Sequence, residues 1–212
     1  MPETPLPLLA DHVHRPPRVA VYPGVFDPPT NAHLEIIETA LGLFDRVHVV
    51  VAVNTSKANA MFAADERVQL MRASLTDRMR PYVDVVAHGG LVAPYAKRLG
   101  ACALVRGMRP GIDPDHEIAL SFMNQKLEPS LPTVLLVASA NHVYLSSTFV
   151  RETAQLEGRI VPGSVSPAVA QALRRRFPAH AASNGGVKGR TSAVGARTPT
   201  PTPTSTPGAG YA

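Results

Sequence analysis

The sequence predicts an α/β protein: a doubly wound, five-stranded parallel sheet with helices on both faces. Two observations predict this class. Five short segments are apolar and rich in β-branched residues, as strands covered on both faces are. Each is separated from the next by a stretch whose apolar residues recur at helical spacing, and this alternation is typical of parallel βαβ units.

The first strand and the first helix meet at a loop rich in proline and glycine. The strand begins with the run VAV at residue 19, and Pro23-Gly24 and Pro28-Pro29 force the chain to turn after it. The next helix is expected over residues 31–43, because Leu34 and Ile37 lie at helical spacing with later apolar residues. This part of the chain therefore reads as strand, tight loop and helix.

The remaining elements continue the alternation. RVHVVVAV is apolar almost throughout, and Asp113-Pro114 marks a helix start because proline fits the first helical turn. The expected elements are strands at 46–53, near 83–86, at 101–107 and at 132–139, and helices at 63–75, 91–99, 115–127, 146–156 and 166–177. Together they predict a Rossmann-like sheet.

The two ends of the chain differ from this pattern. Residues 1–17 are proline-rich and aperiodic, so a flexible N-terminal extension is expected there. Residues 181–212 are rich in Thr, Pro and Gly and cannot bury a core, which predicts a disordered tail. Residues 18–180 are therefore expected to form one domain.

Composition narrows the function classes. The net charge is +5, but the basic residues form no stripe interleaved with aromatic residues, which argues against nucleic acid as a partner. No apolar run approaches the ~18 residues that span a membrane. The N-terminus lacks the pattern of a secretory signal. The single cysteine, Cys102, excludes an intramolecular disulfide and a Cys-based zinc cluster. We expect a cytoplasmic protein whose partner is a small anionic molecule.

The stretch RVAVYPGVFDPPTNAH, residues 18–33, is predicted to hold phosphate. It reads as a strand, a Gly/Pro loop and a helix N-terminus. A helix N-terminus offers unpaired N–H groups and the positive end of the helix dipole. His33 begins that helix and adds a side-chain donor.

Polar and basic residues also follow the other strands. Ligands of open parallel sheets bind beyond the carboxyl ends of the strands, so the residues just after each strand are informative. Arg106 ends an apolar strand, where an unpaired charge is costly, and a bound anion is therefore favoured as its partner. The set comprises Gly24, Phe26, Asp27, Thr30, His33, Lys57, Arg106, Gly107, Arg109, His142, Ser146, Ser147 and Thr148. It suits a polyphosphate.

These segments carry a family resemblance. YPGVFDPPTNAH resembles the (T/H)xGH motif of the nucleotidylyltransferase superfamily. Four further segments resemble bacterial phosphopantetheine adenylyltransferases: FDRVHVVVAVNTSK, MFAADERV, LVRGMRPGIDPDHEIALSFMN and YLSSTFVRE. The resemblance runs in unbroken order over residues 18–177.

The resemblance implies ATP-dependent adenylyl transfer to 4′-phosphopantetheine, giving dephospho-coenzyme A and pyrophosphate in coenzyme A biosynthesis. It also implies a magnesium ion bridging the phosphates, no covalent intermediate, and a homohexamer. Catalytic roles fall to His33, Lys57 and Arg106, and acceptor binding to Val25, Lys57, Val92 and Arg106. ATP binding falls to Val25, Phe26, His33, Gly107, Met108, Arg109, Glu117, His142, Val143, Tyr144, Leu145, Ser146, Ser147 and Thr148.

Departures from the family pattern keep two other functions open. Val25 stands where the family has Ser or Thr, and Ala32 where the motif has Gly; Pro114 and His116 replace aromatic residues. One alternative is a paralogous nucleotidylyltransferase with another phosphorylated acceptor. The other is a non-catalytic nucleotide-binding sensor. For 146–148 and Glu117, a purely local role at a helix start is also open, since hydroxyls cap helices and acids suit the first turn.

Overall fold

The computed structural model describes residues 15–53, 60–109 and 114–178 of the 212-residue chain. The elements are β1 (Val19–Gly24), α1 (Asn31–Leu41), β2 (Arg46–Ala52), α2 (Ala64–Ser74), a short 3-10 helix η2 (Arg80–Tyr82), β3 (Val83–His88), α3 (Val92–Arg98), β4 (Ala103–Met108), α4 (Pro114–Leu127), β5 (Thr133–Val137), α5 (Ser147–Glu157) and α6 (Pro167–Arg176). The expected tail and all but the last residues of the expected extension lie outside the described residues, so both stay predictions.

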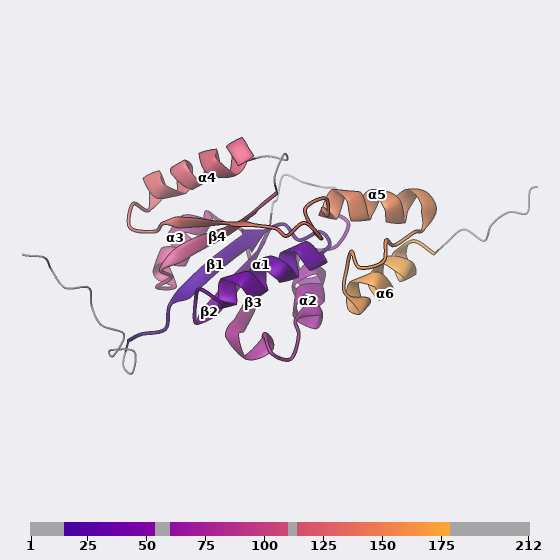
Figure 1. Cartoon of the computed structure of the whole chain (residues 1–212), viewed down its shortest axis with the longest axis horizontal. Coiled ribbons are helices and arrows are strands. Elements are labelled where there is room, and N and C mark those ends of the chain that lie inside the picture. Colours follow the sequence, from indigo (N-terminus) through magenta and orange to yellow (C-terminus); the bar gives the residue numbers. More distant parts are fainter. Residues whose placement is uncertain (1–14, 54–59, 110–113, 179–212) are drawn as a thin grey trace, which may run out of the picture. The chain divides into compact units, whose positions relative to one another are not determined.

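The strands form one parallel five-stranded sheet in the order β3-β2-β1-β4-β5 (Figure 1). β1 is central: Val19 lies opposite Arg46 of β2, and Ala20 lies opposite Ala103 of β4. The chain runs outward from β1 to β3 and then crosses to β4 on the other side of β1. Strand order therefore reverses between β1 and β4, where sheets of this class form a ligand crevice. The predicted fold class is confirmed.

Helices cover both faces of the sheet (Figure 1). Ile37 of α1 and Met71 of α2 are fully buried on one face, against Val49 of β2 and its neighbours. Ala96 of α3 packs on the other face against Val50. Successive side chains of a strand point to opposite faces, so the continuous apolar run of β2 serves both layers.

The helices α5 and α6 pack beside α2, at the end of the sheet where the strands finish (Figure 1). Ser146 caps α5 by accepting a hydrogen bond from the backbone N–H of Phe149 at 3.0 Å, and Gly158 ends the helix with a φ of 62°. Ser166 caps α6 in the same way. Within the described part of the chain, none of the helices is both long and apolar enough to cross a membrane.

Candidate active site

A cavity of about 210 Å³ opens beside the carboxyl ends of β1 and β4, where the strand order reverses. Its walls come from β1 and the following loop, the start of α1, the end of β4, α4, and the chain after β5. The lining residues are Tyr22, Pro23, Gly24, Val25, Phe26, Ala32, His33, Ile36, Arg106, Gly107, Met108, Arg109, Glu117, Ala138 and Leu145. The sequence predicted a phosphate site at this edge.

His33 is the third residue of α1 and has a fixed protonation pattern. The backbone N–H of Thr30 donates to its Nδ1, with 3.0 Å between the nitrogens. A ring nitrogen that accepts a hydrogen bond carries no proton, so neutral His33 holds its proton on Nε2. Burial, assisted by the positive charge of Arg109, lowers the pKa of His33 to about 4. At neutral pH, His33 is therefore an uncharged donor through Nε2.

The loop before α1 is shaped by close packing around Phe26. Phe26 adopts a φ of 50°, which is uncommon for a residue with a side chain. Its ring meets the ring of His33 edge-on, with 5.0 Å between the centroids. A Cβ on Gly24 would lie 2.6 Å from the Phe26 ring, so only glycine allows this approach. The loop therefore supports the imidazole from one side.

Arg106 is paired with Glu117. Arg106 Nε lies 2.6 Å from Glu117 Oε2, and Nη2 lies 2.8 Å from Oε1; Nη1 donates to the carbonyl of Pro23 at 2.8 Å. The negative partner of Arg106 is therefore the carboxylate of Glu117, whereas the sequence had favoured a bound anion in this place. An arginine has five N–H donors, so two remain for a ligand while the pair stays intact.

Arg109 and Gly107 complete the wall on the side of β4. Arg109 donates from Nη1 to the carbonyl of Leu145 at 3.2 Å, which connects the end of β4 to the segment before α5. A Cβ on Gly107 would lie 3.1 Å from Ile36, so this position also favours glycine. Met108 lies between them and lines the cavity.

The segment from His142 to Thr148 contributes Leu145 to the cavity lining, and its polar side chains are engaged elsewhere. His142 Nδ1 contacts Glu35 Oε2 at 2.5 Å. Ser147 donates to the carbonyl of Pro28 at 2.8 Å, and Thr148 accepts from Arg151 at 3.0 Å. The cap at Ser146 is the local role that was left open for this segment, whereas Ser147 and His142 make contacts with residues more than a hundred positions away.

The structure brings most, but not all, of the predicted residues together. Val25, Phe26, His33, Arg106, Gly107, Met108, Arg109, Glu117 and Leu145 line the cavity; His142, Val143, Tyr144, Ser146, Ser147 and Thr148 flank it without lining it. Val92 begins α3 and packs against the core on the α3 face of the sheet, away from the lining. Lys57 lies outside the described residues.

Two acidic residues make structural contacts beside the site: Asp27, which the sequence had placed in the polyphosphate set, and Glu35, which it had not singled out. Asp27 is buried, and its carboxylate accepts the backbone N–H groups of Met61 and Phe62 at 2.7 and 2.9 Å. Glu35 accepts from the backbone N–H of Ser139 at 2.9 Å as well as from His142. Burial opposes the ionisation of Glu35, but the hydrogen bonds from His142 and Ser139, together with the charge interaction with His142, outweigh it and lower the pKa of Glu35.

A parallel sheet with a histidine at the first helix N-terminus and an arginine at the switch point fits a nucleotidyltransferase, and the comparisons with known proteins show this class. The family model described as cytidylyltransferase-like matches residues 21–153. The chain is 42% identical over 160 residues to the phosphopantetheine adenylyltransferase of Moorella thermoacetica, covering 76% of this chain and 98% of that one. It is 41% identical over 162 residues to that of Geobacter sulfurreducens, covering 76% and 96%. The chain belongs to the phosphopantetheine adenylyltransferase family.

Solved structures support the fold. A nicotinic acid mononucleotide adenylyltransferase from Plasmodium falciparum matches with a TM-score of 0.53 and 12% identity, over 76% of this chain and 95% of that one. A bifunctional NMN adenylyltransferase/ADP ribose pyrophosphatase from Francisella tularensis matches with a TM-score of 0.57 and 17% identity, over 76% and 49%. Both have the nucleotidylyltransferase fold seen here.

Proposed function

We propose that the protein transfers the adenylyl group of ATP to 4′-phosphopantetheine, giving dephospho-coenzyme A and pyrophosphate for coenzyme A biosynthesis. The relatives that carry this name match over nearly their whole length. One observation carries the chemistry: the uncharged donor of His33 and the paired guanidinium of Arg106 line the same cavity. A hydrogen-bond donor and a fixed cation can stabilise the negative charge that develops on a transferred phosphoryl group in the transition state.

The reaction needs no general base. A phosphate monoester has a second pKa near 6, so the acceptor oxygen is already ionised at neutral pH. This oxygen attacks the α-phosphorus of ATP; the bond to the bridging oxygen breaks, and the electron pair leaves with pyrophosphate. His33 donates from Nε2 to the α-phosphate as charge accumulates there. The two remaining N–H groups of Arg106 hold the acceptor phosphate in line.

Mg²⁺ is the cofactor that we propose. Among the described residues, no group of three or more His, Cys, Asp or Glu side chains is placed to hold a metal. Glu117, an acid that lines the cavity, is already bound by Arg106. Mg²⁺ characteristically keeps substrate phosphates and waters as ligands. When bound with ATP, Mg²⁺ would supply positive charge at the phosphates, and the residues of this chain would hold the nucleotide rather than the ion.

A homohexamer in the cytoplasm is the state that we propose for the enzyme. The helix α4 buries none of its residues in the single chain. It exposes Ile118, Phe122, Met123 and Leu127, an apolar surface suited to a second copy of the chain. Sedimentation analysis tests this directly, since Phe122→Glu should lower the sedimenting mass.

One alternative acceptor remains in the proposal because of Val25. Its side chain lines the cavity, is 45% exposed and cannot donate a hydrogen bond to a phosphate. The family has Ser or Thr at this position, and valine lacks their hydroxyl. A paralogous enzyme that acts on another phosphorylated acceptor would tolerate the loss of this hydroxyl more easily than an enzyme that uses it to bind 4′-phosphopantetheine.

The test is an acceptor panel. Purified protein with ATP and Mg²⁺ should release pyrophosphate with 4′-phosphopantetheine, and should release none with pantetheine, which lacks the attacking phosphate. Release only with another phosphorylated compound would favour the paralogue. ATP binding without release on any acceptor would favour the sensor.

A further inference from the structure

Arg67 on α2 is a buried arginine that meets backbone carbonyls in place of a carboxylate. Its residue is 4% exposed. Nε donates to the carbonyl of Phe62 at 3.1 Å, and Nη1 donates to the carbonyls of Val25 at 2.6 Å and Ala52 at 3.1 Å. Within the described residues, no carboxylate forms a salt bridge with it. The guanidinium therefore joins the start of its own helix to the end of β2 and to the loop after β1, which are 15 and 42 residues away in sequence.

Packing alone does not account for an arginine at this position. Removing a cation from water is costly unless hydrogen bonds and nearby charge compensate for it. Three backbone carbonyls supply these hydrogen bonds to Arg67. A planar guanidinium with donors fixed in a fork holds several acceptors in one geometry, which the point charge of a lysine does not do.

The three carbonyls place this clamp on one side of the cavity. Val25 belongs to the loop after β1 and lines the cavity, and Ala52 ends the neighbouring strand β2. Phe62 precedes α2, and its backbone N–H is also held by the carboxylate of Asp27. Two separate contacts thus tie the loop after β1 to the start of α2. Gly107, Arg109 and Leu145 form the other side, beyond β4.

Under the proposed function, the two sides of the cavity differ in what they are assigned to bind. On the side of β1 and β2, Val25 is assigned to the acceptor as well as to ATP; Val92 lies away from the lining, and Arg106, which is also assigned to the acceptor, belongs to β4. The residues assigned to ATP alone follow mainly β4 and β5. Arg67 contacts only the first group of strands and is not itself in the lining.

We propose that Arg67 is a positioning residue that fixes the acceptor side of the active site, by holding the loop at Val25 against the end of β2. This inference rests on the proposed function. Its effect should appear in the KM for 4′-phosphopantetheine, because misplacement of that wall weakens acceptor binding. The KM for ATP should change less, because the residues assigned to ATP alone lie mainly on the side of β4 and β5.

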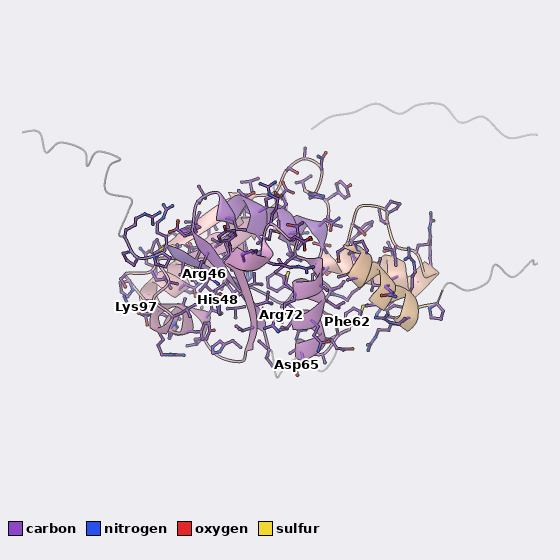
Figure 2. All side chains as sticks on the ribbon, turned by 90° about the horizontal axis from the view of Figure 1, so that it is seen from below. Arg46, His48, Phe62, Asp65, Arg72 and Lys97 are labelled. Atoms are coloured by element: carbon purple, nitrogen blue, oxygen red, sulfur yellow. The ribbon has the colours of Figure 1, made fainter. Side chains whose placement is uncertain are left out.

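The experiment compares three variants of the full chain. Arg67→Lys keeps the charge but loses the fork, and Arg67→Met removes both. Arg72→Met is the matched control: Arg72 lies on the same helix and donates to the carbonyl of Val85 at 2.7 Å, away from the cavity (Figure 2). Steady-state kinetics with each substrate varied separately, and thermal denaturation, are measured for all of them.

Both Arg67 variants should raise the KM for 4′-phosphopantetheine at least tenfold and the KM for ATP less than threefold. Arg72→Met should leave both values within threefold of the parent protein. Equal increases in the two KM values, or acceptor KM values within threefold in a folded Arg67→Lys, would overturn the proposal. The unsubstituted protein is the separate control on the function: if it fails to turn over 4′-phosphopantetheine, the proposed function is wrong, whatever the variants do.

Discussion

The Nδ1 atom of His33 accepts the backbone N–H of Thr30 at 3.0 Å. This one contact decides which nitrogen carries the proton and directs the donor role to Nε2. Protonation of His33 at Nδ1 would break the contact, so hydrogen bonding and burial both favour the uncharged ring. The geometry thus explains how a neutral histidine, which carries no positive charge at neutral pH, can still donate a hydrogen bond.

The first prediction concerns the pH dependence of stability. The pKa of folded His33 is about 4, against an ordinary value of 6.5, so the unfolded chain binds more protons between these values. The stabilisation is fully present above pH 6.5 and is lost as the pH falls toward 4. The loss is on the order of 3 kcal/mol at most.

Chemical denaturation at pH 7 and pH 4.5 measures this loss against His33→Gln, which cannot titrate. The variant should lose less stability over the same interval. His48, whose pKa is also lowered by burial, is common to both proteins and cancels. Equal losses in the two proteins would show that His33 titrates normally.

The second prediction concerns the pair of Arg106 and Glu117. Because each holds the other, Arg106→Lys and Glu117→Gln should each lower kcat/KM by about 10-fold or more, and the double variant should be little worse than Arg106→Lys alone. The expected coupling is about 1 kcal/mol or more. Independent, multiplicative losses would contradict the pairing. Arg46 (Figure 2) forms an exposed pair with Asp84 at 2.9 Å, and Arg46→Gln, which disrupts this pair, should leave kcat/KM unchanged.

The third prediction tests the support beneath His33. Gly24→Ala introduces a Cβ 2.6 Å from the ring of Phe26, so this ring, which packs edge-on against His33, must shift. We expect a loss of about 1–3 kcal/mol in the free energy of unfolding, as for other overpacked sites, together with reduced turnover. Gly89→Ala is the control, because its Cβ would have no described atom closer than 3.8 Å. A stable and fully active Gly24→Ala would refute the packing argument.

The fourth prediction addresses acceptor choice. Val25→Thr adds a hydroxyl to the cavity wall with little change in volume. If 4′-phosphopantetheine is the acceptor, its KM should fall severalfold, since a new donor faces its phosphate. A higher KM for this acceptor would support the paralogue. The control is Leu43→Thr, which introduces a threonine on the exposed surface. Val21→Thr would not serve as a control, because Val21 is buried in the core.

Patterns within short stretches of sequence predicted much of this molecule. The strand β2 follows from a continuous apolar run, and the turn before His33 follows from nearby Gly and Pro residues. Both elements are found where the sequence predicted them. Sheet topology then placed His33 and Arg106 at one edge, because parallel strands end together.

Partner choice could not be predicted in the same way. Ser147 reaches the carbonyl of Pro28, 119 residues earlier, so its hydroxyl depends on how α5 lies over the loop. Arg106 of β4 binds Glu117 because α4 packs against β4. Arg67 resembles an ordinary charged residue of an amphipathic helix, and only the packed structure shows it buried. These contacts depend on tertiary geometry, which periodicity does not encode.

The most direct test of the central claim is the rate at which dephospho-coenzyme A forms from ATP and 4′-phosphopantetheine, followed by mass spectrometry in the parent protein and in His33→Ala. We predict steady product formation in the parent and a loss on the order of 10³-fold in the variant, whose transition-state donor is gone. Undiminished product formation by folded His33→Ala, or none by the parent protein, would contradict the account.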